Sequence, residues 1–364
     1  MPQAIWIDDE RELEALARRL RAAERIGVDT EFLRERTYFP QLCLLQIECG
    51  GDICCVDALA MPLAALVPTL DAPAPRKLIH AARQDLEALH RATGRIATPI
   101  FDTQIAAACA GLKPQIGYAE LARDLLGVNL DKAHTRTDWS RRPLSPEQLS
   151  YAADDVRYLD EIAAALERRL RELDREHWVR EDCAALADPR LYEPDPACAW
   201  ERLGGIARLE PRARTRARAI AAWRERTARE RNRPRAWILP DAAVYEIAQS
   251  DAASPRELAR LPAMRQKLQA ALAEDLLAAL ARIDPDEPCG SEPVPGAAKS
   301  AAEKAAIERM VRVLDARAAE LGLRAEVLAT RAQIRSLATG AREVGALAGW
   351  RRAVIGERLL AALE

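Results

Sequence analysis

The chain has 364 residues, enough for two or three domains, and 49% of them are apolar. Its formal net charge of -2 indicates no particular class of binding partner. The sequence shows neither a long apolar run nor a basic leader, so we expect a cytoplasmic protein that does not bind a membrane. The eight cysteines form no C-x-x-C pair, so the spacing of a zinc site is absent and reduced thiols are expected.

The start of the chain predicts three neighbouring strands behind one helix. Apolar spacing predicts an amphipathic helix over 9–24, followed by a strand over 26–32. Two more strands, over 40–48 and 53–57, flank the turn residues Gly50–Asp52. We expect these three strands to be adjacent and antiparallel.

Strands and helices then alternate, which favours a parallel portion of the same sheet. Ser145, Pro146 and Glu147 have the residue types of a helix start. We therefore expect residues 1–185 to form one α/β domain. The predicted elements, in chain order, are a helix over 61–70, a strand over 77–80, a helix over 84–92, a strand over 100–102, and helices over 103–112, 118–126 and 145–175.

The rest of the chain is predicted to be helical, in two blocks separated by linkers. Three prolines exclude regular structure over 188–196, and a Pro/Gly-rich segment over 283–296 is expected to be flexible. The blocks between and after these linkers span 197–283 and 299–364. Their similar size suggests diverged copies of one module, although the sequence shows no convincing register between them.

The strand over 26–32 carries two carboxylates, Asp29 and Glu31. Side chains alternate along a strand, so both point to the same face. Like charges side by side are unfavourable unless a positive group lies between them, and a divalent cation held by oxygen ligands would serve. The alternative interpretation is a solvated edge strand with an acidic face.

Three further positions could join this pair. Asp85 lies at the start of a predicted helix, where a carboxylate is favoured by the helix dipole whether or not it has a function. Tyr151 and Asp155 are four residues apart on the predicted 145–175 helix and therefore share a face. Asp154 is three residues from Tyr151, so spacing alone does not exclude it.

Taken together, these positions resemble the three motifs of the DEDD superfamily of exonucleases, tyrosine subclass. The neighbouring residues resemble the ribonuclease D family in particular: Val28–Gln46 the first motif, His80–Glu87 the second, and Thr135–Ser145 with Tyr151–Leu159 the third. Residues Trp200–Pro240 are similar to the HRDC domain, the helical domain named for helicases and ribonuclease D. The resemblance covers about the first 280 residues well, and 299–364 match by position more than by motif.

The resemblance implies a ribonuclease H-like mixed-sheet exonuclease domain over 1–185, followed by HRDC-like helical domains over 197–283 and 299–364. It implies a metal-dependent 3′-5′ exoribonuclease that trims structured RNA such as tRNA precursors and releases 5′-mononucleotides. A DNA exonuclease of the same superfamily would have the same metal site and stays an alternative. The second alternative is an RNA-binding scaffold without catalytic activity. The presence of all five site residues of the family argues against this alternative.

The family also implies a role for each site residue. Asp29 would bridge two Mg²⁺ or Mn²⁺ ions, which carboxylate oxygens suit. Glu31 and Asp155 would complete the first ion site, and Asp85 would help to bind the second ion. Tyr151 would orient the attacking water, and its usual pKa of about 10 makes it a poor base at neutral pH.

Three further residues, Asp154, Phe32 and His80, lie in or beside the motifs. Asp155 is assigned as the ligand because it completes Tyr-x-x-x-Asp, which leaves Asp154 on the polar side with Arg157. The family suggests that Phe32 stacks on the terminal base, and a plain core position is the alternative. His80 precedes Asp85 and is a candidate substrate contact, with a core histidine as the alternative.

A basic run lies in the first helical block. Twelve arginines and four glutamates between Trp200 and Arg235 give a local excess of eight positive charges. Such an excess predicts a binding surface for a polyanion, here RNA. The alternative is a helix surface whose arginines are paired within the protein.

Overall fold

A computed structural model describes residues 4–130, 137–264, 269–284 and 300–363. The chain forms two compact units. The first contains residues 1–33, 40–189 and 300–364, and the second contains 34–39 and 190–299. Within the described residues, no helix is long and apolar enough to cross a membrane.

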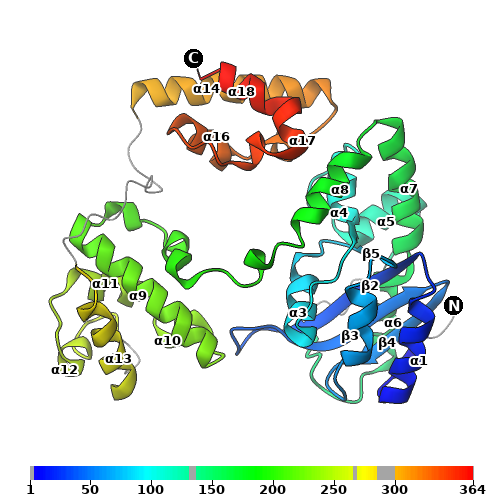
Figure 1. Cartoon of the computed structure of the whole chain (residues 1–364), viewed down its shortest axis with the longest axis horizontal. Helices are drawn as coiled ribbons and strands as arrows, with labels where there is room; N and C mark the ends of the chain where they lie inside the picture. Colours follow the sequence, from blue (N-terminus) through cyan, green and yellow to red (C-terminus); the bar gives the residue numbers. More distant parts are fainter. Residues whose placement is uncertain (1–3, 131–136, 265–268, 285–299, 364) are drawn as a thin grey trace. The chain divides into compact units, whose positions relative to one another are not determined.

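The first unit is built around one six-stranded mixed sheet, in the order β1-β4-β3-β2-β5-β6 (Figure 1). β2, β3 and β4 are antiparallel neighbours, whereas β5 runs parallel to β2 and β6 parallel to β5, which confirms the predicted mixed sheet. β1, which the sequence did not indicate, lies parallel to β4 at the edge. The strands are β1 (Ile5–Ile7), β2 (Arg25–Leu33), β3 (Gln41–Cys49), β4 (Asp52–Asp57), β5 (Arg76–Ile79) and β6 (Ile100–Asp102).

Helices surround this sheet, and two of them position the residues of interest: α3 packs against β2 and β3, and α6 against β2, β3 and β4. The predicted 61–70 helix is wrong in extent, because it begins as a 3-10 turn, and α2 starts only where Pro68 occupies its first turn. The helices are α1 (Glu10–Leu20), α2 (Val67–Leu70), α3 (Arg83–Thr93), α4 (Thr103–Cys109), α5 (Tyr118–Leu126), α6 (Pro146–Arg157), α7 (Leu159–Glu172) and α8 (Glu176–Ala185).

The single helix predicted over 145–175 is wrong, because the chain breaks it at Tyr158. There the backbone leaves the helical conformation (φ -111°, ψ 11°), and the Tyr158 N–H donates to the hydroxyl of Tyr118 (3.0 Å). The start of α6 does follow the prediction: Ser145 caps it, and Gln148 completes a capping box. The break separates α6, which carries Tyr151 and Asp155, from α7.

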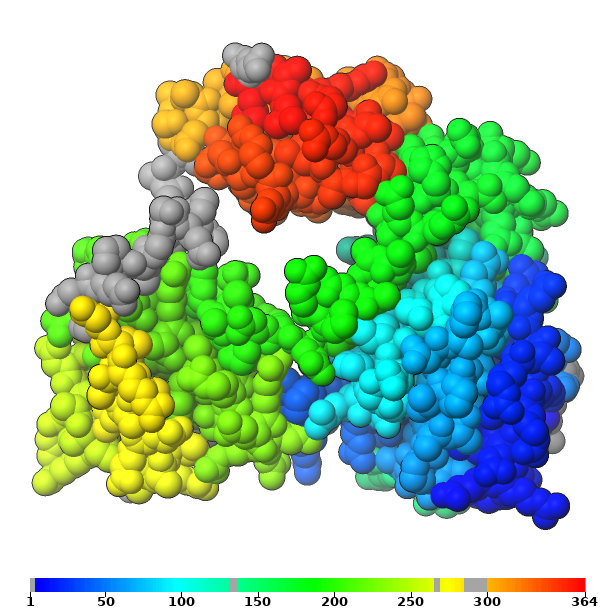
Figure 2. Space-filling view, in the orientation of Figure 1, coloured from blue at the N-terminus to red at the C-terminus, as the bar shows by residue number. Residues whose placement is uncertain are grey.

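The C-terminal helices pack onto α8 as part of the first unit (Figure 2). Trp178 and Trp350 stack with ring centroids 4.0 Å apart and planes 5° from parallel. Arg351 makes two hydrogen bonds to the Asp182 carboxylate (2.5 and 2.8 Å). These helices are α14 (Ala301–Glu320), α15 (Ala325–Leu328), α16 (Arg331–Ala338), α17 (Gly349–Arg351) and α18 (Glu357–Ala361).

The second unit is helical, as predicted. Its helices are α9 (Pro211–Glu230), α10 (Arg235–Ile238), α11 (Asp241–Gln249), α12 (Pro255–Leu258) and α13 (Ala270–Ala281). The predicted linker over 188–196 contains only the short 3-10 turn Pro189–Leu191 and leads into a second one at Pro196. Of the predicted flexible linker over 283–296, residues 285–296 lie outside the described residues.

The two helical blocks share a register that their sequences did not reveal. α9 and α14 each have 20 residues, and α10 and α15 each have 4. The first three helices of the second block, α14, α15 and α16, each begin ninety residues after α9, α10 and α11 respectively. The turns that follow the long helices also match: Asn232 (φ 46°) and Gly322 (φ 64°) both adopt the left-handed conformation. The first three helices of the two blocks therefore follow the same order, with the same lengths for the first two and the same spacing.

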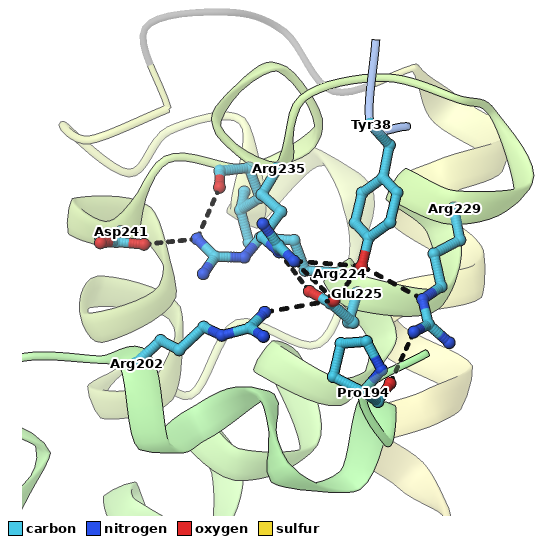
Figure 3. Close-up of polar contacts among 9 residues, drawn as sticks. Tyr38, Pro194, Arg202, Arg224, Glu225, Arg229, Arg235 and Asp241 are labelled. Carbon is cyan, nitrogen blue, oxygen red and sulfur yellow. Dashed lines mark hydrogen bonds and ion pairs between the residues drawn. The ribbon is translucent and has the colours of Figure 1, made fainter. Parts of the chain in front are cut away.

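The segment between β2 and β3, residues 34–39, is part of the second unit (Figure 3). Tyr38 is 6% exposed, and its hydroxyl donates to the buried Glu225. The same hydroxyl accepts hydrogen bonds from Arg235 (3.1 Å) and Arg229 (3.2 Å). Asn232 Oδ1 accepts the backbone N–H of both Tyr38 and Phe39, each at 3.1 Å. A few residues next to the β2 strand are thus held firmly inside the helical unit.

Candidate active site

Carboxylates from two elements meet beside β2. Asp29, Glu31 and Asp155 each offer one oxygen, and these oxygens lie within 4.8 Å of one another. Asp29 and Glu31 lie two residues apart on β2, and Asp155 reaches them from α6, which packs against that strand. Three carboxylate oxygens at this separation can share a hard divalent cation.

Asp85 lies next to this group, in the first turn of α3. Its Oδ1 accepts a hydrogen bond from Thr30 Oγ1 at 2.6 Å, and both side chains are buried. Asp85 is not one of the three residues whose oxygens lie within 4.8 Å. Its charge nonetheless helps to raise the pKa of Asp29 and of Asp155. The arrangement allows Asp85 to act on a neighbouring ion position rather than on the same one.

The cluster is electrostatically unfavourable without a cation. Burial, reinforced by the other three acids, raises the pKa of Asp29 well above its usual value. Burial and the charges of Asp155 and Asp85 raise the pKa of Glu31 to about 8. Burial is also the main cause that raises the pKa of Asp85 and of Asp155 to about 7. Four neighbouring acids, one buried and three partly buried, whose pKa values are all raised mark a site that a cation would stabilise.

Tyr151 lies one helical turn before Asp155 on α6, and its hydroxyl donates a hydrogen bond to that carboxylate. Burial and the negative charge of Asp155 raise the pKa of Tyr151, so the phenol stays protonated. The tyrosine can therefore donate a hydrogen bond at the site but cannot act as a base near neutral pH. The carboxylate of Asp154 instead forms an ion pair with Arg157, with 2.7 Å between Oδ1 and Nε.

The strand does not stay regular after Glu31. The pairing of β2 with β3 shifts register between Glu31 and Phe32, as in a β-bulge, and bulges re-aim side chains. Phe32 is only partly buried. The bulge and the partial burial both argue against the alternative in which Phe32 is simply a core residue.

Both ring nitrogens of His80 are occupied within the domain. Nδ1 lies 2.9 Å from the Thr103 hydroxyl, and Nε2 lies 2.9 Å from the Ile116 carbonyl oxygen. A carbonyl can only accept, so Nε2 carries the proton and Nδ1 accepts from Thr103. Burial lowers the pKa of His80, which favours this neutral form. This geometry favours the core-histidine alternative.

Two residues that support the site were missed by the sequence reasoning: Thr30 and Asp102. Asp102 is 3% exposed, and its carboxylate accepts the N–H groups of Ala81 (3.1 Å) and Ala82 (2.8 Å). Ala81 has a left-handed backbone (φ 59°), and the turn leads directly into the helix that carries Asp85. The only sequence signal was the position of Asp102 as the cap before Thr103.

The basic run of the first helical block is used largely within the protein. Arg224 donates to Leu239 O and to Asp241, and Arg216 donates to the last carbonyls of α11. Arg218 lies over the Trp200 ring at 3.8 Å. The prediction of a binding surface over the whole run is therefore too broad. The exposed arginines of the run are Arg202, Arg208, Arg212, Arg226, Arg231 and Arg233.

The mixed sheet and the acid cluster beside β2 fit a 3′-5′ exonuclease, and comparison with known proteins shows that class. Residues 4–171 match the family described as 3′-5′ exonuclease, and residues 213–280 match the HRDC domain. The ribonuclease D of Granulibacter bethesdensis is 38% identical over 99% of this chain and 92% of its own length. That of Xanthomonas oryzae pv. oryzae is 39% identical over 99% and 98%. The chain belongs to the ribonuclease D family.

Solved structures agree with this assignment. The crystal structure of Escherichia coli RNase D, an exoribonuclease involved in structured RNA processing, matches 100% of this chain and 99% of its own, with a TM-score of 0.88 and 28% identity. The predicted family, exonuclease fold and 3′-5′ exoribonuclease activity are confirmed. Exonucleases of this family depend on divalent metal ions. The second HRDC-like domain, over 299–364, stays a prediction, as does the cytoplasm as compartment.

Proposed function

We propose that this exoribonuclease trims the 3′ ends of structured RNA, tRNA precursors among them, and releases 5′-mononucleotides. The observation that carries the proposal is the meeting of three carboxylate oxygens within 4.8 Å, on the strand and helix that the family motifs occupy. The E. coli relative, which acts on structured RNA, supports the substrate class.

In this proposal two Mg²⁺ or Mn²⁺ ions are bound by Asp29, Glu31, Asp85 and Asp155. Oxygen donors alone suit these hard ions, and the described cluster contains neither a thiolate nor an imidazole. Bound ions of this kind supply an activated water and stabilise charge on the attacking and leaving oxygens of a phosphodiester. The raised pKa values fit such a role, because a bound cation would replace the protons that the buried acids otherwise hold.

The other candidate residues, Tyr151, Phe32 and His80, are considered for contacts with the attacking water or the RNA. The Tyr151 hydroxyl donates its proton to Asp155, which fixes the phenol in place, and the phenol oxygen would accept a hydrogen bond that orients the attacking water. Phe32, re-aimed by the bulge, offers a ring to the terminal base. His80 supports the domain rather than contacting the substrate directly, since both of its ring nitrogens are already hydrogen-bonded.

The test uses the full chain on one hairpin with a single-stranded 3′ tail, prepared as RNA and as DNA and labelled at the 5′ end. With Mg²⁺ we expect a ladder that shortens from the 3′ end of the RNA, 5′-mononucleotide products, and no reaction in EDTA. Equal or faster shortening of the DNA would favour a DNA exonuclease. Internal cleavage, or activity that survives EDTA, would contradict the proposal.

A further inference from the structure

A wide groove opens on the second unit beside α10 and α11. It has a volume of about 1630 Å³, and its lining includes Arg231, Arg233, Trp237 and Tyr245, which we call the Trp237 groove. Trp237 is 52% exposed, although the other tryptophans of the described residues are buried or partly buried. An exposed tryptophan beside exposed arginines is unusual enough to need an explanation.

The second helical block provides an internal comparison. At the same register, ninety residues later, Leu321, Leu323 and Val327 replace Arg231, Arg233 and Trp237. Leu323 and Val327 are 8% and 7% exposed and belong to the core cluster of the first unit. The helical arrangement thus forms with aliphatic residues at these positions, and its fold does not require a tryptophan or two arginines there.

The groove is also rigidly supported. Trp237 lies on α10, whose first residue, Arg235, pairs with the buried Glu225 and contacts Tyr38 (Figure 3). Just after α10, the Leu239 carbonyl accepts a hydrogen bond from the buried Arg224 (3.0 Å). A tryptophan on a helix that is fixed at both ends is pre-organised for binding, which reduces the entropy lost when a ligand docks.

The chemistry of the groove fits an unpaired RNA strand. Its volume exceeds the roughly 300–1,000 Å³ of a typical small-molecule pocket, which favours a chain segment over a metabolite. Aromatic rings stack on unpaired bases, and arginine binds phosphate. The one acidic residue of the lining, Glu246, already accepts the N–H of Ala263 (2.6 Å). With two arginines and one glutamate, the lining still carries a net positive charge, which attracts an anion.

We propose that the Trp237 groove binds unpaired nucleotides of the RNA substrate, with a base stacked on Trp237 and phosphates held by Arg231 and Arg233. This inference rests on the proposed function for its ligand. It adds a second contact, far along the chain from the acid cluster, that recognises single-stranded RNA next to a folded body. A double helix fits less well, because its bases are already stacked on one another.

The test measures RNA binding in EDTA, so that no strand is degraded. The probes are a fluorescent RNA hairpin with an unpaired eight-nucleotide extension and the same hairpin with blunt ends. The full chain is compared with Trp237→Ala and Trp237→Phe, and with Leu173→Ala as an exposed apolar control in the first unit. We expect Trp237→Ala to bind the extended hairpin about tenfold more weakly, and Trp237→Phe within about twofold of wild type.

The arginines are tested by salt dependence. With Arg231→Gln and Arg233→Gln combined, the slope of log affinity against log salt on the extended hairpin should become shallower by about 1.4, as for two lost phosphate contacts on a single strand. This variant also keeps the proposal testable if Trp237→Ala does not fold. An unchanged slope would contradict it.

Three other results would overturn the inference. In the first, Trp237→Ala binds the extended hairpin as tightly as wild type. In the second, Trp237→Phe and Trp237→Ala lose the same amount of RNA affinity. In the third, the wild type is a dimer that Trp237→Ala converts to a monomer, which would make the groove a protein interface. Failure here is separable from failure of the proposed function. Binding of the hairpin in EDTA needs no hydrolysis, and ladder formation does not report on this groove.

Discussion

Thr30 and Asp85 join the central strand of the exonuclease unit to α3: Thr30 Oγ1 donates to Asp85 Oδ1 at 2.6 Å, with both side chains buried. Thr30 lies between Asp29 and Glu31 in the sequence, so one strand supplies two of the acids and also holds a third. We interpret Thr30 as a positioning residue, which acts through Asp85 rather than on the substrate.

Replacement of Thr30 by valine keeps the shape and removes the hydroxyl. We expect kcat to fall by about ten- to a hundredfold with little change in KM, because a carboxylate displaced by a fraction of an ångström no longer matches its ion. The lost hydrogen bond should also lower the free energy of unfolding by about 1–3 kcal/mol. Thr30→Ser keeps the donor and should restore most of kcat. A valine variant with wild-type kcat would refute this role.

Asp102 is expected to position Asp85 from the other side, through the turn at Ala81 and Ala82. Asp102→Ala leaves two N–H donors of that turn unsatisfied, and we expect weaker metal activation, seen as a higher Mg²⁺ concentration for half-maximal rate. Asp102→Asn retains one acceptor oxygen and should recover part of the loss. If the alanine variant needs no more Mg²⁺ than wild type, Asp102 has only a structural role.

The stack of Trp178 on Trp350 predicts that the C-terminal helices contribute to the stability of the exonuclease unit. Trp350 is 5% exposed, so Trp350→Ala should lower the free energy of unfolding by about 3–5 kcal/mol in urea titrations. Trp237→Ala is the matched control and should cost less than about 0.5 kcal/mol, because that side chain is exposed. Similar losses for the two variants would show that residues 300–363 do not support the first unit.

The acid cluster predicts how stability depends on pH when metal is removed. The pKa of Glu31 is raised from 4.5 to about 8 in the folded protein, so between these values the folded state binds more protons than the unfolded state. The free energy of unfolding in EDTA should therefore fall as pH rises from about 5 to about 8. Glu31→Gln should reduce this slope, and saturating Mg²⁺ should remove most of it. An identical slope for wild type and Glu31→Gln would contradict the account.

Much of the exonuclease fold could be predicted from the sequence, because its strands are short, apolar and bounded by turn residues. The strand with Asp29 and Glu31 and the hairpin after it follow from alternation and a Gly-Gly turn alone. The break at Tyr158 could not be predicted, because it depends on a hydrogen bond to Tyr118, forty residues away in the chain. β1 was missed because three residues give too little periodicity.

In the candidate site, too, part of the arrangement could be predicted from the sequence and part could not. Asp29, Glu31 and Asp155 could be placed on shared faces by spacing, but their convergence depends on how α6 packs against β2. The basic run was read too broadly because sequence does not show which arginines are buried: Arg224 and Arg216 are bonded to backbone carbonyls. The role of Tyr38 in the second unit was also invisible, since its partner Glu225 lies 187 residues further on.

The central claim is that the carboxylates at Asp29 and Asp155 carry out metal-dependent hydrolysis at an RNA 3′ end. The most direct measurement is the initial rate of label release from 3′-labelled precursor tRNA in Mg²⁺ by wild type, Asp29→Asn and Asp155→Asn, with folding checked by circular dichroism. We expect each variant to fold and to lose at least about a thousandfold in rate, equivalent to about 4 kcal/mol of transition-state stabilisation. A folded variant that releases the label at a rate within tenfold of wild type would contradict the account.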